Sequence, residues 1–139
     1  MDLAGRRWPS IIDRSDVILL DTNAFLWLER DHPRSRVLRR SAGRLYVSPA
    51  TLLELQFLCE IGRIRLKAGV QVDDLSTSLR CAVDDPPAAA WFAAAQSLSW
   101  TRDPFDRLIV AHAKYRGWKL ATGDGLILQN LEGSSLIEL

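Results

Sequence analysis

The residues best placed to do chemistry are acids at positions that usually hold apolar side chains or end a strand. Asp21 and Asp124 each follow a short apolar run closely, so we expect both at the carboxyl end of a strand. Aspartate is also common in turns and helix caps at such junctions, which leaves a purely structural role open for either residue. Their chemistry therefore depends on which other polar groups reach the same edge.

Two further acids fall on helix faces that we predict to point inward. At 100° per residue, Glu54 shares a face with apolar neighbours on its helix, namely Ala50, Phe57, Leu58 and Ile61. Asp106 shares a face with apolar neighbours in the same way, namely Ile109, Val110 and Ala113. An ionised carboxylate is costly to bury alone, so each acid needs a cation, a metal or the rim of a cleft. A core glutamate paired with an arginine is the structural alternative for Glu54.

The start of the later helix offers a second explanation for part of this pattern. Asp103 fits the N-cap of the helix that begins at Pro104, and Asp106 fits its third position. Favourable interaction with the helix dipole accounts for acids there without catalysis. Capping is therefore the role that we expect for Asp103, whereas Asp106 also faces inward.

Convergence of these acids on one sheet edge would predict a metal site. Carboxylates brought together repel one another strongly, and a divalent cation relieves that repulsion. The set offers oxygen ligands alone, which favours a hard ion such as Mg²⁺ or Mn²⁺ over zinc. Ions held in this way polarise phosphates and lower the pKa of a bound water, which predicts phosphoryl chemistry.

The elements that must position the acids alternate between short apolar strands and helices. We predict strands at 17–20, 45–47, 118–122 and 136–137, and helices at 23–30, 35–41, 49–61 and 104–116. Helical spacing also joins Val72, Leu75 and Leu79, and an Ala-rich helix ends near residue 97. This alternation indicates an α/β fold with a mainly parallel sheet and helices on both faces. In such sheets the functional cleft lies at the carboxyl ends of the strands.

Composition narrows the class of protein. The 139 residues are 47% hydrophobic and 25% charged, which suits one globular domain, expected at 16–139 after an N-terminal extension at 1–15. The net charge of +1 excludes a strong general field for nucleic acid, so such binding must be local. No apolar run is long enough to cross a bilayer, and we expect a cytoplasmic protein. Cys59 and Cys81 fit no disulfide or zinc pattern and are expected as reduced packing residues.

Four segments together resemble the PIN-domain family, and most closely its VapC-like toxin ribonucleases of toxin-antitoxin pairs. The segments are LLDTN at 19–23, Val47-Ser48 with Glu54, WTRDPFDRLIVA at 100–111, and TGD at 122–124. The resemblance spans about residues 16–139, and its specific part is DPFDR, since an isolated DTN or a single acid is a weak signal. It implies a PIN-like three-layer sandwich and a hydrolase, a Mg²⁺- or Mn²⁺-dependent endoribonuclease.

The resemblance also implies the roles of individual residues. The catalytic and metal-binding acids of the family match Asp21, Glu54, Asp106 and Asp124. Auxiliary roles follow for Thr22, in holding a water network, and for Asp103, as a cap or outer ligand. Arg107 and Arg102 are the basic residues nearest the acids in sequence and are expected to contact phosphate. Relatives often carry a bulkier residue at the position of Gly123. The exact position of Asp124 therefore depends on how this glycine packs.

The implied partners are an RNA substrate, a cognate antitoxin and a second copy of the chain in a homodimer. An antitoxin segment is expected in apolar grooves beside the acids, with a basic side chain in the acidic pocket. The densest basic cluster consists of Arg34, Arg36, Arg39 and Arg40. We expect it to be a solvent-exposed charged face, and contact with RNA is the alternative. Trp27, Trp91 and Trp100 are expected to pack in the core or an interface rather than against bases.

Three other functions stay open on the residues alone. They are an RNA-processing PIN nuclease without an antitoxin, a noncatalytic binding module whose acids serve structure, and a phosphoaspartate receiver. A neighbouring gene for a small DNA-binding antitoxin would distinguish a toxin from an RNA-processing nuclease. A noncatalytic binding module would show no metal-dependent cleavage. The third lacks a convincing second acid beside Asp21 and a suitably placed late lysine.

Overall fold

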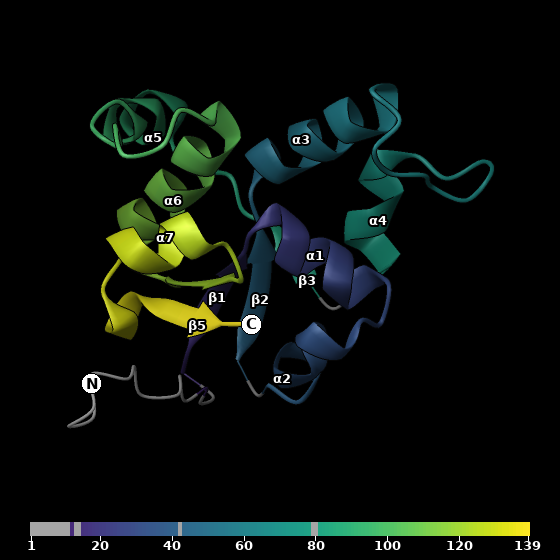
Figure 1. Cartoon of the computed structure of the whole chain (residues 1–139), viewed down its shortest axis with the longest axis horizontal. Helices are drawn as coiled ribbons and strands as arrows, with labels where there is room; N and C mark the ends of the chain where they lie inside the picture. Colours follow the sequence, from purple (N-terminus) through teal and green to yellow (C-terminus); the bar gives the residue numbers. More distant parts are fainter. Residues whose placement is uncertain (1–11, 13–14, 42, 79–80) are drawn as a thin grey trace.

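A computed structural model describes residues 12, 15–41, 43–78 and 81–139 of the chain (Figure 1). Its five strands are β1 (Val17–Leu20), β2 (Arg44–Val47), β3 (Cys81–Val83), β4 (Lys119–Thr122) and β5 (Leu136–Glu138). They form one sheet in the order β3-β2-β1-β4-β5, and every neighbouring pair is parallel. The expected extension at 1–15 and the predicted helical position of Leu79 lie almost wholly outside the described residues.

Helices connect successive strands and cover both faces of the sheet. They are α1 (Thr22–Glu29), α2 (Arg36–Arg39), α3 (Pro49–Glu60), α4 (Val72–Ser78), α5 (Ala88–Ala95), α6 (Pro104–Arg116) and α7 (Gly125–Asn130), with 3-10 turns η1 (Pro33–Ser35) and η2 (Gly133–Ser135). None of the helices in the described residues is long and apolar enough to span a membrane. The predicted α/β fold is confirmed.

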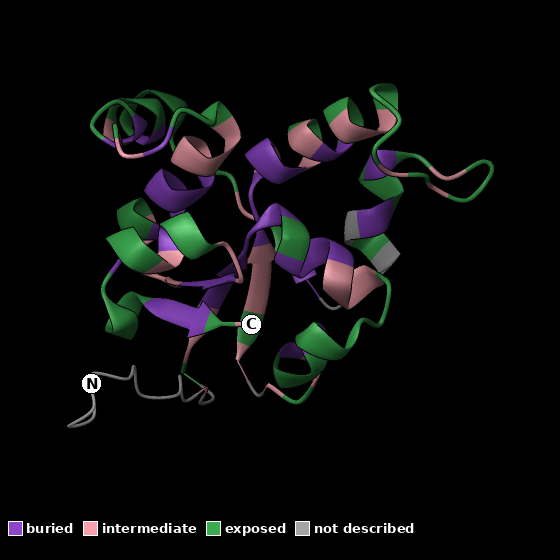
Figure 2. Cartoon of the chain, viewed as in Figure 1, coloured by how far each residue is buried: buried purple, intermediate pink, exposed green. Residues whose placement is uncertain are grey.

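The central strand shows why the sheet needs helices on both sides. Ile18 and Leu20 pack in a core shared with α1 to α4, whereas Leu19 packs in a second core shared with α5, α6 and α7. All three side chains are fully buried, and Figure 2 colours most of β1 as buried. Alternate residues of one apolar strand therefore fill two cores, which explains the absence of polar alternation in the sequence.

Two elements were absent from the predictions. β3 is a strand of three residues at the sheet edge, with Ala82 and Val83 exposed, so it carries too little apolar pattern to be recognised. α7 is only six residues long, and its one sequence signal is Asp124, which caps its first turn. Both free cysteines are confirmed as unpaired: Cys81 is buried, and Cys59 is half-buried.

The predicted inward face of α3 was wrong in part. The buried residues are Ala50, Thr51 and Leu55, whereas Phe57 and Ile61 are about half exposed. Apolar residues occur on nearly every side of this helix, so periodicity alone could not decide which side would pack against the sheet. Glu54 consequently lies on the flank of the buried face and is half-buried.

Candidate active site

The strand register brings several polar residues to one edge of the sheet. Leu20, the last residue of β1, pairs with Val47 on one side and with Ala121 on the other. Asp21 and Ser48 directly follow β1 and β2, and Thr122 is the last residue of β4, so all three lie at the carboxyl edge. This is the edge at which parallel α/β sheets place their functional clefts.

Asp21 is buried, and both its carboxylate oxygens are hydrogen-bonded. One oxygen accepts from the backbone N–H of Ala24 at 2.7 Å and so caps α1. The other accepts from the hydroxyl of Thr122, at the end of β4. The same Thr122 oxygen accepts from the backbone N–H of Asp124 at 3.0 Å. Thr122 therefore fixes Asp21 and Asp124 relative to each other.

Thr22 and Glu54 form the next contact along the edge. The Thr22 hydroxyl donates to Oε1 of Glu54, which joins the start of α1 to α3. The hydroxyl of Thr51, also buried, lies 3.4 Å from the same Thr22 oxygen. The auxiliary residue Thr22 thus orients a candidate acid directly.

The two acids of the DPFDR segment have different surroundings. Asp103 is exposed, and its Oδ1 accepts from the backbone N–H groups of Phe105 at 2.8 Å and Asp106 at 3.3 Å, so it is the predicted N-cap. Asp106 is half-buried and shares a helix face with the buried Ile109 and Val110, as the spacing predicted.

The acids at this edge lie near enough to raise one another's pKa. Burial raises the pKa of Asp106 to about 7, and the charges of Asp103, Asp124, Glu54 and Asp21 raise it further in that order. Burial raises the pKa of Asp21 to about 6 despite its hydrogen bonds, with Asp124 and Glu54 contributing. Burial also raises the pKa of Glu54, against the hydrogen bond from Thr22. The fold therefore gathers Asp21, Glu54, Asp106 and Asp124, together with Asp103.

Within the described residues, no lysine or arginine forms an ion pair with these acids. Arg107 donates from Nε to the carbonyl of Thr101 at 2.8 Å, and Arg102 is exposed; the predicted phosphate contact of either residue stays a prediction. The arginine partner considered for Glu54 is thus not found among the described residues. No cation in the described part of the chain compensates the acids through an ion pair.

The donor set fits a hard divalent cation in its chemistry, because carboxylate oxygens alone meet at this edge and burial strengthens their repulsion. As they stand, however, no three histidine, cysteine, aspartate or glutamate side chains of the described residues surround a single point closely enough to hold an ion.

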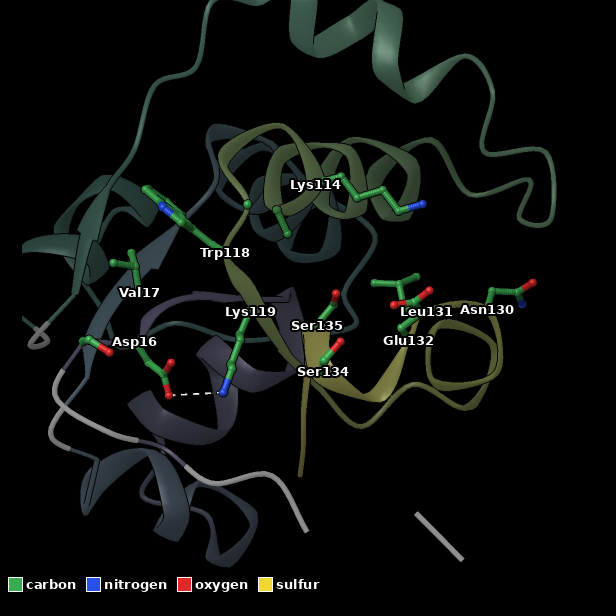
Figure 3. Close-up of a pocket in the computed structure, with 13 residues that line it drawn as sticks. Asp16, Val17, Lys114, Trp118, Lys119, Asn130, Leu131, Glu132, Ser134 and Ser135 are labelled. Atoms are coloured by element: carbon green, nitrogen blue, oxygen red, sulfur yellow. Dashed lines mark hydrogen bonds and ion pairs between the residues drawn. The ribbon is translucent and has the colours of Figure 1, made fainter. Parts of the chain in front are cut away.

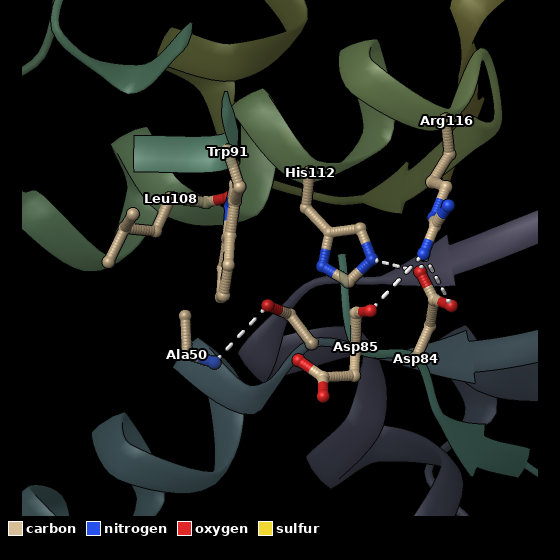
Figure 4. Close-up of polar contacts among 8 residues, drawn as sticks. Ala50, Asp84, Asp85, Trp91, Leu108, His112 and Arg116 are labelled. Carbon is tan, nitrogen blue, oxygen red and sulfur yellow. Dashed lines mark hydrogen bonds and ion pairs between the residues drawn. The ribbon is translucent and has the colours of Figure 1, made fainter. Parts of the chain in front are cut away.

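A second polar cluster at this edge was not anticipated from the sequence (Figure 4). Asp84 follows β3, and its Oδ2 lies 2.6 Å from Nε2 of the fully buried His112 and 2.8 Å from Nε of Arg116. Burial raises the pKa of Asp84, but the hydrogen bonds from Arg116 and His112 outweigh it and hold the pKa below its usual range. Burial lowers the pKa of His112. This cluster ties edge strand β3 to α6, and its acid is neutralised by its neighbours.

The opposite edge of the sheet holds a cavity of about 620 Å³ that contains none of the candidate acids (Figure 3). It lies between the starts of β1 and β4 and the turn before β5, where Asp16 and Lys119 form an ion pair at 3.3 Å. The acidic edge, and not this cavity, carries the groups that the sequence singled out.

Comparison with known proteins gives concordant results. The sequence profile of the PIN domain matches residues 18–129. The chain is 33% identical over 113 residues to Ribonuclease VapC22 of Mycobacterium tuberculosis. This alignment covers 77% of this chain and 86% of the relative.

Solved structures share the fold at lower identity. A VapBC2 structure from Rickettsia felis, bound to a promoter DNA fragment, superposes with a TM-score of 0.61 at 16% identity, covering 88% of this chain and 98% of that one. A toxin-antitoxin complex from Klebsiella pneumoniae superposes with a TM-score of 0.61 at 15% identity, covering 88% and 99%.

Proposed function

Since the chain belongs to the PIN-domain family, we propose that it is a metal-dependent endoribonuclease and the toxin of a toxin-antitoxin pair. One observation carries the nuclease proposal: four half-buried or buried carboxylates converge at the carboxyl edge of the sheet with no cation to balance them among the described residues. The similarity to a curated ribonuclease supports RNA as the substrate.

Asp21, Glu54, Asp106 and Asp124 are the residues that would hold Mg²⁺ or Mn²⁺. When bound, such an ion polarises a phosphate and lowers the pKa of a water, so that hydroxide can attack phosphorus. The chain itself orients the ligands: Thr122 fixes Asp21 and the backbone of Asp124, and Thr22 fixes Glu54. Burial and the neighbouring carboxylates raise the pKa of Asp106 to about 7, and a bound cation would favour its ionised form.

Cleavage of RNA by the purified protein tests this proposal. We expect new RNA ends when total RNA is incubated with the protein and Mg²⁺ or Mn²⁺, and none when the ions are chelated. Asp106→Asn should give no cleavage while keeping the fold, because the amide preserves the shape but not the charge. Cleavage that persists in the chelator, or in Asp106→Asn at the wild-type rate, would contradict it.

We also propose a cognate antitoxin and a homodimer in the cytoplasm. The solved relatives include toxin-antitoxin complexes, and the chain offers an apolar row for a partner on α3, where Leu53 is 61%, Phe57 47% and Ile61 50% exposed. Coexpression with a small neighbouring gene should relieve toxicity and copurify a complex. Toxicity unchanged by every adjacent small gene would favour an RNA-processing nuclease without an antitoxin. Sedimentation of the purified chain measures the dimer.

A further inference from the structure

The arginines of the basic cluster at residues 34–40 differ in the groups that their side chains contact. Arg39 forms an ion pair with Asp31. Arg34 instead lies with its guanidinium carbon 5.0 Å from the centroid of the Trp27 ring. Over the described residues Arg34 is exposed and makes no ion pair with a carboxylate. Its charge is therefore held in place by an aromatic face and is not neutralised.

Gly123 brings this pair to the acidic edge. A Cβ built on Gly123 would lie 2.8 Å from Cη2 of Trp27 and 3.3 Å from Nη1 of Arg34. Only a residue without a side chain permits this approach, and the next residue is Asp124. Gly123, which differs from the bulkier residue that relatives often carry, thus lets the Arg34 guanidinium lie beside the backbone next to Asp124, a proposed metal ligand.

Arg34 lies beside the turn that carries Asp124, and it forms no ion pair with an acid of the described residues. It makes no ion pair with Asp124, and it is not among the charges that shift the pKa of Asp21 or Asp106. A cation inside the acid cluster would compete with a metal ion. One just outside it leaves the metal site intact and can bind a phosphate next to the one being cleaved.

A groove continues from Arg34 along η1 and α2. Its volume is about 530 Å³, and Arg34, Arg36 and Arg40 line it with the exposed Val37, while Glu138 is the acid on its wall. Among the lining residues that the structure describes, three guanidinium groups outnumber the single acidic side chain, Glu138, and this excess of positive charge suits a polyanion. A row of cations with apolar surface between them suits a flexible single strand.

We infer that Arg34, seated on Trp27 against Gly123 and continued by Arg36 and Arg40, binds the phosphate backbone of single-stranded RNA beside the acidic site. This inference rests on the proposed ribonuclease function. A planar guanidinium can bind two phosphate oxygens at once, and stacking on Trp27 fixes the plane in advance.

Binding is measured in the Asp106→Asn background, so that the probe, a fluorescein-labelled single-stranded RNA of mixed sequence, is not cut. Arg34→Ala should weaken binding about tenfold and lower the slope of log affinity against log salt by about one. Arg40→Ala should weaken it less, because Arg40 stacks on no aromatic ring of the described residues. Arg65→Ala is the matched control, since Arg65 is an exposed arginine in the loop between α3 and α4, and its affinity should equal that of the background protein.

Cleavage by the otherwise wild-type chain gives a second readout. Arg34→Ala should raise KM about tenfold and leave kcat within about twofold, because the contact is with the bound strand and not with the reacting atoms. Arg34→Lys should keep the salt slope and recover part of the affinity, since it restores the charge without the planar group.

The two proposals fail in different ways. RNA affinity and KM unchanged in Arg34→Ala, while the wild type cleaves RNA, would overturn this inference alone and would leave the groove to an acidic peptide. An equal loss in Arg65→Ala would also overturn it, because the effect would then be one of net charge. A wild type that neither binds nor cleaves RNA with metal would overturn the proposed function.

Discussion

Asp106 has the least favourable surroundings for a charge among the candidate acids. Its pKa of about 7 results first from burial and then from four neighbouring carboxylates, and none of the causes acts in the opposite direction. Burial also raises the pKa of Asp21, to about 6, and the hydrogen bonds from Thr122 and the backbone of Ala24 partly offset that rise. Under the proposed function, protonation of Asp106 near neutral pH would compete with metal binding.

The raised pKa of Asp106 predicts how the stability of the metal-free protein changes with pH. A folded-state pKa above the unfolded value of 3.8 means that the folded form binds more protons, so the stabilising contribution of Asp106 is present below pH 3.8 and is lost as the pH rises through about 7. Urea unfolding in chelator should show that Asp106→Asn gains stability relative to wild type as the pH rises. A difference between the two that stays constant with pH would contradict the raised pKa.

Asp103 and Asp106 should respond differently to the same substitution. Asparagine at position 103 can still accept the hydrogen bonds of the cap, so Asp103→Asn should keep the fold and most of the cleavage. Removing its negative charge lowers the pKa of Asp106, and the acid limb of the pH-rate profile should move to lower pH. Loss of cleavage as complete as in Asp106→Asn or Asp21→Asn would place Asp103 in the catalytic set.

At the scale of elements, the site depends on how α1 and the β4–α7 turn pack together. Gly123 touches Trp27 so closely that an added methyl would force the indole to move. Gly125, two residues later at the start of α7, has open space around its Cβ position. The two glycines therefore form a matched pair for testing that packing.

Gly123→Ala should lower the free energy of unfolding by about 1–3 kcal/mol, as overpacking does. Gly125→Ala should raise it by about 0.4–1 kcal/mol, because alanine restricts the unfolded chain and fits the native site. Chemical denaturation measures both changes. Equal effects of the two substitutions would show that the contact between Gly123 and Trp27 does not constrain the turn.

Edge strand β3 depends on the cluster of Asp84, His112 and Arg116. Asp84→Ala should destabilise the fold by about 1–3 kcal/mol, since it leaves the buried His112 without its partner. Asp85→Ala is the control, because the side chain of Asp85 is exposed and only its carbonyl accepts from Arg116. That change should stay within about 0.5 kcal/mol. Similar losses from both would mean that local charge, and not the buried contact, stabilises β3.

For the whole molecule, metal binding and folding should be linked. The folded chain gathers the acids and the unfolded chain separates them, so Mg²⁺ or Mn²⁺ binds the native form preferentially. Free metal at about 100 times its Kd contributes about 2.7 kcal/mol, which raises the Tm of a domain of this size by several degrees. Without metal at pH 8, Asp106→Asn should melt above wild type and should gain less when metal is added. A wild-type Tm unchanged by metal, with a lower Tm in Asp106→Asn, would make the acids structural.

The sequence by itself determined four of the five described strands, most of the helices and the edge at which the acids gather. An aspartate close behind an apolar strand has one possible edge in a parallel sheet, so Asp21 and Asp124 could be placed from local pattern alone. The caps at Asp103 and Ser48 are local as well, because each side chain binds the backbone two or three residues onward.

Only the tertiary structure decided which surfaces meet. The flank position of Glu54 depends on which side of a nearly uniformly apolar α3 packs against the sheet. The seat of Arg34 joins α1, η1 and the turn after β4, and the contact between Asp84 and His112 joins residues 28 apart. Such contacts follow from close packing between elements, which the periodicity of any single element does not encode.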